Sequence, residues 1–123
     1  MRISLVTSMI LAASVVFGAV DISGKWQAEF DTQIGKQNYT FTFRVVGEKL
    51  IGLAESEIMG EKHKADLKDV KVVGEEVSFV EMLDFQGNAI SISYKGKISG
   101  DEIKFTRQVG EFATEELVAK RLK

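Results

Sequence analysis

The chain has 123 residues, with no cysteine, no proline and a single histidine, and its formal net charge at pH 7 is −2. The lack of cysteine excludes disulfides, thiolate metal sites, iron–sulfur clusters and a thiol nucleophile, and one histidine excludes a multi-histidine metal site. A net charge this close to zero does not indicate a protein that binds nucleic acid or an anionic membrane surface. We therefore predict no metal, no cofactor and no nucleic-acid partner.

Residues 1–19 have the character of a secretory signal peptide. Met1 and Arg2 form a short positive start, and the uncharged apolar segment 3–17 follows. A membrane-spanning helix needs about 20 apolar residues, whereas the apolar region of a secretory signal is shorter. We predict cleavage after Gly18 or Ala19 and an exported protein, periplasmic or extracellular, with no membrane span in the mature chain. An uncleaved N-terminal anchor is the alternative. Residues 20–123 are then a single domain.

A short phrase of glycine, an acidic residue and an aliphatic residue recurs at 46–50, 73–77 and 99–103, and further glycine turns lie between its copies. The resulting turns are 10 to 14 residues apart and contain Gly35, Gly47, Gly60, Gly74, Gly87, Gly100 and Gly110. Tight hairpins require positive φ, which glycine adopts readily. Seven turns predict eight strands.

Apolar and polar residues alternate between these turns, as they do in half-buried strands. In chain order, the apolar faces contain Trp26, Ala28, Phe30, Tyr39, Phe41, Phe43, Val45, Ile90, Ile92, Tyr94, Gly96, Ile98, Ile103, Phe105 and Val109. The parity changes between Leu67 and Val70, which predicts a β-bulge near Lys68 and Asp69. Residues 111–122 would also suit an amphipathic helix, but we prefer an eighth strand because it removes both free edges.

The third and fifth segments carry apolar residues on both faces. Either a partner covers the outside of these strands, or the register that we assign to them is wrong. The candidate outer face consists of Ile51, Leu53, Val80 and Met82.

This pattern predicts an all-β fold, an eight-stranded antiparallel up-and-down β-barrel in the form of a meander. The interior of an eight-stranded barrel is filled by side chains or holds one small ligand. Many of the inward residues are bulky, which favours a filled interior. The small inward residues Gly52, Ala54, Gly96 and Ala119 favour an open one.

Gly24, Lys25 and Trp26 open the first strand and Arg121 lies on the last, an arrangement that resembles the calycin (lipocalin-like) family. The resemblance implies that Trp26 plugs one end of the barrel and that Arg121 packs across it in a cation–π contact. The chain is also similar to small exported bacterial β domains that open with S-G-x-W, repeat x-G-D-x-I and end in a strand like its own residues 113–121, which begin with A-T-E and end with A-K-R. That likeness implies a fold and export, and no defined activity.

Glu81 and Arg107 lie on faces that we expect to point into the barrel. A buried charge must be paired or it becomes neutral. Together with the hydroxyls of Tyr39 and Tyr94, these groups are candidate ligand contacts. The alternatives are a structural ion pair or a register in which Glu81 faces water, and, for the tyrosines, simple filling of the core.

His63 is the single histidine of the chain. It follows the turn at Gly60 and is flanked by two lysines, so we expect it to be solvated at the start of a strand. The sequence has no G-x-S-x-G nucleophile elbow, and we identify no catalytic residue.

We therefore predict an exported barrel that binds a small apolar or mixed-polarity ligand through Tyr39, Glu81, Tyr94 and Arg107. The alternative is a non-catalytic interaction or accessory module with a filled barrel, which uses an outer strand face for a protein partner or for a homodimer. An enzyme has the least support.

Overall fold

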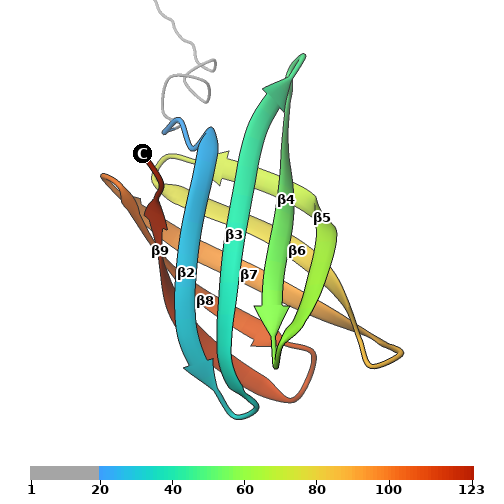
Figure 1. Ribbon diagram of the computed structural model, residues 1–123. Helices are drawn as coiled ribbons and strands as arrows, with labels where there is room; N and C mark the ends of the chain where they lie inside the picture. The colour runs from blue at the N-terminus through green and yellow to red at the C-terminus, as the bar shows by residue number, and fades with distance from the viewer. Residues whose placement is uncertain (1–19) are drawn as a thin grey trace, which may run out of the picture.

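The computed structural model describes residues 20–123, which form a closed antiparallel β-barrel. Its strands follow one another in chain order (Figure 1): β2 (Gly24–Thr32), β3 (Gly35–Val46), β4 (Lys49–Ile58), β5 (Glu61–Val73), β6 (Glu76–Phe85), β7 (Asn88–Ser99), β8 (Glu102–Val109) and β9 (Ala113–Arg121). The last strand pairs with the first, and Trp26 lies opposite Arg121. The eight-stranded up-and-down barrel is thus confirmed. The predicted leader, 1–19, lies outside the described residues.

The predicted glycine turns connect the strands in strict alternation between two ends of the barrel. Their glycines have φ values from 51° at Gly110 to 109° at Gly35. The turns at 33–34, 59–60, 86–87 and 110–112 lie at one end, which we name the open end (Figure 1). The turns at 47–48, 74–75 and 100–101 lie at the other, together with residues 20–23 and the C-terminus. We name this the closed end. Residues 20–123 contain no helix long and apolar enough to cross a membrane.

The predicted bulge in β5 is present. Pairing of β5 with β6 shifts register between Lys68 and Lys71, and Asp69 between them has a φ of 54°. An extra residue in one strand moves the following side chains to the other face. The bulge therefore explains the change of parity between Leu67 and Val70.

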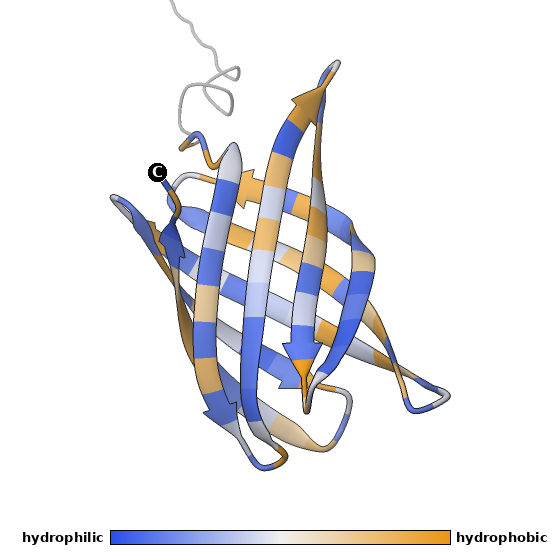
Figure 2. Cartoon of the chain, viewed as in Figure 1, coloured by the Kyte–Doolittle hydropathy of each residue, from blue (hydrophilic) through white to orange (hydrophobic). Residues whose placement is uncertain are grey.

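The register of the third and fifth predicted strands is now defined. β4 points Gly52, Ala54 and Ser56 inward, and β6 points Phe79 and Glu81 inward. The candidate outer-face residues lie on the opposite faces of these strands (Ile51, Leu53, Val80 and Met82). Banding along the strands in Figure 2 follows this alternation of hydrophobic and hydrophilic residues.

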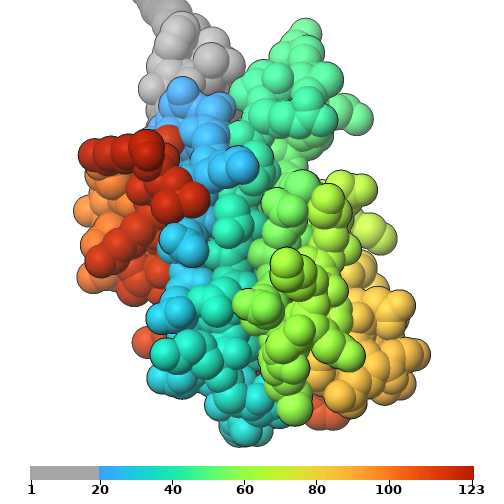
Figure 3. Space-filling model, in the orientation of Figure 1, coloured from blue at the N-terminus to red at the C-terminus, as the bar shows by residue number. Residues whose placement is uncertain are grey.

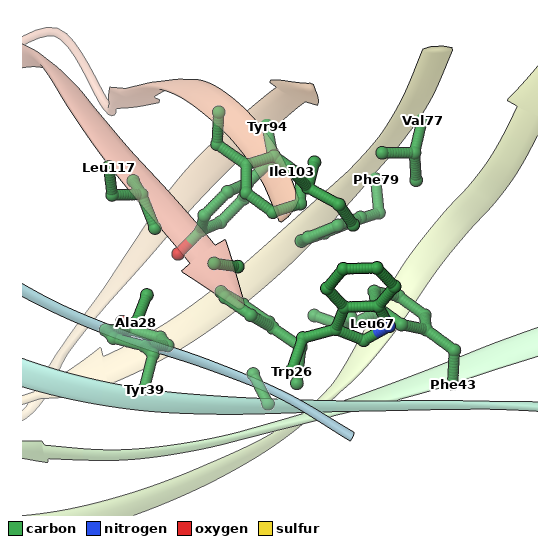
Figure 4. Close-up of a cluster of buried hydrophobic side chains, with 14 of the residues drawn as sticks. Trp26, Ala28, Tyr39, Phe43, Leu67, Val77, Phe79, Tyr94, Ile103 and Leu117 are labelled. Atoms are coloured by element: carbon green, nitrogen blue, oxygen red, sulfur yellow. The ribbon is translucent and has the colours of Figure 1, made fainter. Parts of the chain in front are cut away.

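Aromatic rings fill the middle of the barrel. Phe79 stacks on Tyr94 with ring centroids 4.6 Å apart, and Phe41 lies 5.7 Å from Phe105. Figure 4 shows side chains of β2 and β3, among them Trp26, meeting those of β6 and β7 across the interior. In Figure 3 the side chains of β2, β3, β4 and β5 form a continuous wall on the side facing the viewer.

Two of the small inward residues, Gly52 and Gly96, leave no open space beside them, which favours the filled interior of the two possibilities that the sequence left open. A Cβ atom on Gly96 would lie 2.5 Å from Cδ1 of Phe105 and 2.7 Å from Cγ2 of Ile103. A Cβ atom on Gly52 would lie 2.8 Å from Cδ1 of Leu67. Neighbouring large side chains occupy the volume that glycine leaves, so small and large residues interdigitate as they do in close-packed interiors.

We expect Gly96→Ala to lower the free energy of unfolding by about 1–3 kcal/mol, because the added methyl group overpacks the core. Chemical denaturation measures this change. In a Phe105→Leu background the same substitution should cost less, since the ring that it meets is gone. Equal costs in the two backgrounds would contradict the packing explanation.

Candidate functional site

A pocket of about 290 Å³ lies at the open end of the barrel. Most of its wall consists of apolar side chains from the turns and strand ends there, including Ile34, Leu83, Phe85, Ile90, Val109 and Phe112. Gln37, Arg107 and Glu115 are polar groups in the lining, and the first two are buried. An apolar concavity with a few fixed polar groups has the usual composition of a small-molecule site.

Arg107 is the centre of the polar residues that line the pocket. Its Nε donates to Glu115 Oε1 at 2.8 Å, and its Nη2 lies 2.7 Å from the same oxygen. Nη1 donates to the hydroxyl of Tyr94 at 2.9 Å, and Nη2 donates to Gln37 Oε1 at 2.8 Å. The guanidinium carbon lies 4.7 Å from the ring centroid of Phe30, within the range of a cation–π contact. This buried cation therefore has partners both around its edge and on its face.

Glu81 continues the network deeper in the barrel. Its Oε1 accepts a hydrogen bond from the Tyr94 hydroxyl at 2.8 Å, and its Oε2 accepts one from Tyr39 at 3.1 Å. Burial raises the pKa of Glu81 above its ordinary value, although both hydrogen bonds and the charge of Arg107 act in the opposite direction. Burial, reinforced by the charge of Glu81, also raises the pKa of Tyr39 to about 12.

The structure brings all four predicted ligand contacts into one hydrogen-bond network, but only one of them can be reached from the pocket. Arg107 lines the pocket, whereas Tyr39, Glu81 and Tyr94 lie behind it in the core. The ion pair considered for Glu81 and Arg107 is not a direct contact, because the Tyr94 hydroxyl bonds to both. The carboxylate that pairs with Arg107 is Glu115.

Gln37 and Glu115 were missed by the sequence reasoning. Glu115 is on the same face of β9 as the buried Leu117 and Ala119. Gln37 is two residues before Tyr39, on the inward face of β3. The two-residue period of a strand places both side chains on the inward face, so the sequence alone could have predicted their inward positions.

His63 is not solvated, which corrects our expectation. Its side chain is only 14% exposed, and its ring lies 5.7 Å from that of Phe85. The flanking lysines point outward because neighbouring residues of a strand face opposite ways. In register it lies opposite Ser56. Within residues 20–123, neither the Oγ of Ser56 nor the Nε2 of His63 has a hydrogen-bond partner.

Trp26 and Arg121 lie together at the closed end. The guanidinium carbon of Arg121 is 4.3 Å from the ring centroid of Trp26. The Trp26 Nε1 donates to the carbonyl oxygen of Ile22 at 2.9 Å, and Arg121 donates to the carbonyl oxygens of Ser23 and Asp21 at 2.8 and 3.0 Å. These bonds hold residues 21–23 across the closed end. The pocket lies at the opposite, open end.

A scan against protein-family models, a search of curated proteins and a search of solved structures found no match to this chain. The closed barrel is compatible with a lipocalin-like fold, and membership of the calycin family stays a prediction. In the described part of the chain, no group of three or more histidine, aspartate or glutamate side chains is placed to hold a metal ion.

We expect Arg121→Ala to lower the free energy of unfolding by about 1–2 kcal/mol, because it removes the cation–π contact with Trp26. Thermal or chemical denaturation measures the loss. Lys120→Ala is the matched control, since Lys120 is exposed on the neighbouring position of β9. Similar losses in both variants would contradict a specific role for the Trp26–Arg121 contact.

We expect Glu81→Gln to change the pH dependence of stability. Since the folded-state pKa of Glu81 is raised, the contribution of its protonated form to stability is fully present below the ordinary pKa of 4.5 and is lost as the pH rises through the raised pKa. The stability advantage of the unsubstituted protein over Glu81→Gln should therefore shrink from acidic to neutral pH in denaturation curves. Glu57→Gln, at an exposed position of β4, is the control. A constant difference across this range would contradict the raised pKa.

Proposed function

We propose that this protein binds one small, mainly apolar molecule of mixed polarity at the open end of its barrel. The observation that carries the proposal is the pocket of about 290 Å³, whose apolar wall includes the buried, hydrogen-bonded Arg107. Pockets of this composition bind through apolar contact and use a few polar groups to orient the ligand.

In this proposal the polar residues have two roles. Arg107, Glu115 and Gln37 line the pocket and can contact the head group of the ligand. Tyr94 bonds to Arg107, and Glu81 and Tyr39 extend that network, so these three hold the guanidinium in place. The aromatic core fills the space behind them and limits the ligand to the open end.

Phe112 supplies a further argument for the position of the ligand. Its side chain is 80% exposed, and it lines the pocket. Covering an exposed apolar side chain with a ligand is favourable by about 25 cal/mol for each Å² removed from water. The open end can therefore gain apolar burial from a ligand that extends out of the pocket.

We also propose that binding takes place after export. The motivation is the leader-like composition of residues 1–19, with an uncharged apolar segment behind a short basic start. The ligand would then be a molecule of the periplasm or the extracellular medium.

An interaction module that uses the outer face is a weaker candidate. Leu53 lies opposite Asp66 in register, and Val80 lies opposite Lys68. Charged side chains of β5 thus separate the apolar residues of β4 from those of β6. Met82 is the most exposed of the four outer-face residues, at 37%. This arrangement gives a protein partner or a second copy two separate apolar pairs instead of one patch.

We expect Ala113→Trp to abolish binding, because Ala113 lines the pocket and an indole there would fill it. The measurement is titration with the neutral fluorescent probe N-phenyl-1-naphthylamine. The unsubstituted protein should bind about one equivalent, and the variant should bind at least about tenfold more weakly.

Ala89→Trp is the matched control, because Ala89 is an exposed alanine on the nearby strand β7 and does not line this pocket. Circular dichroism shows whether both variants remain folded. Binding that is equal in the two variants, or absent from the unsubstituted protein, would reject this site.

A further inference from the structure

We propose that the pocket selects a ligand with an uncharged head group that donates a hydrogen bond, such as an amide or a hydroxyl, and discriminates against the corresponding carboxylate. This inference rests on the proposed function, since it names the chemical class of the molecule bound at the open end. It is carried by the contacts that Arg107 and Glu115 already make.

The charge of Arg107 is compensated within the protein. Oε1 of Glu115 lies 2.8 Å from Nε and 2.7 Å from Nη2 of the guanidinium. Glu115 is itself only 16% exposed, so the pair is largely removed from water. A ligand carboxylate would have to compete with Glu115 or remain without a counterion, and a buried charge without a partner is strongly unfavourable.

Most hydrogen-bond donors of Arg107 are also engaged. The two terminal nitrogens of Arg107 donate to Tyr94 and Gln37. The side-chain nitrogen of Gln37 donates to Thr32 Oγ1 at 3.2 Å. Donors already in use offer little to an acceptor on the ligand.

An acceptor, by contrast, is free. Both contacts of Arg107 with Glu115 go to Oε1, and no hydrogen bond to Oε2 is made within residues 20–123. Because Glu115 lines the pocket, Oε2 can accept a hydrogen bond from the ligand. The polar residues of the pocket therefore match a ligand that donates a hydrogen bond.

A second carboxyl group lies beneath this pair. Glu81 is buried, bonded to two tyrosine hydroxyls, and makes no ion pair within the described residues. Glu81 therefore offers a ligand anion no counterion, and the Arg107–Glu115 pair above it is already neutral. A ligand cation would meet the guanidinium in an already neutral Arg107–Glu115 pair. An uncharged donor avoids both costs.

The test compares four ligands with the same eight-carbon acyl or alkyl chain, by displacement of N-phenyl-1-naphthylamine at pH 7.5. Octanamide is neutral and donates, methyl octanoate is neutral and does not donate, octanoate is an anion and octylamine is a cation. We expect octanamide to bind at least about tenfold more tightly than either charged ligand. It should also bind no more weakly than methyl octanoate, although the ester is more apolar.

Glu115→Gln makes the test specific, because it frees the positive charge of Arg107. We expect it to shift the octanoate-to-octanamide affinity ratio at least about tenfold in favour of octanoate. Glu116→Gln is the control with the same change of charge, since Glu116 is the exposed neighbour of Glu115 on β9, and it should leave the ratio unchanged.

Three results would overturn the inference. They are tighter binding of octanoate or octylamine than of octanamide by the unsubstituted protein, tighter binding of methyl octanoate, and an equal ratio in the two glutamine variants. If Glu115→Gln does not fold, the comparison of the four ligands with the unsubstituted protein decides the matter alone. If no probe binds at all, the proposed function fails, an outcome distinct from binding with the opposite preference.

Discussion

Closure of the sheet between β2 and β9 is the constraint on which the rest of the structure depends. The pairing of Trp26 with Arg121 in register brings the two ends of the domain together. It removes both free edges and makes every strand present one face to a narrow interior. Because Arg121 also packs on the Trp26 ring and binds the backbone of residues 21 and 23, the same contact covers one end. The pocket is left at the opposite end.

A closed interior puts strict conditions on polar residues. Arg107 and Glu81 are almost entirely shielded from water, so their charges must be compensated, hydrogen-bonded or neutralised within the barrel. Arg107 is compensated by Glu115 and bonded to Tyr94, while burial raises the pKa of Glu81. The residues that stabilise these charges also set what the pocket can bind, because a group already paired does not hold a ligand of opposite charge strongly.

Much of the fold could be predicted from local patterns. Glycine spacing located the turns, two-residue alternation defined the faces, and a change of parity predicted the bulge near Lys68 and Asp69. The inward positions of Glu81 and Arg107 followed from the same alternation. His63 was misplaced because its lysine neighbours were given more weight than its parity. Glu115 was missed because residues 111–122 also suited an amphipathic helix, and the inward position assigned to Ala119 was not extended back along the strand to Glu115.

The sequence by itself determined the strands, the turns and the face on which most side chains lie, since these depend on neighbours within a few residues. Only the tertiary structure decided that Arg107 pairs with Glu115 while Tyr94 links it to Glu81. It also decided that Phe105 occupies the space beside Gly96, which leaves the pocket to the open end. These contacts depend on the register of eight strands around a closed barrel and on mutual packing of side chains across it, neither of which a local pattern specifies.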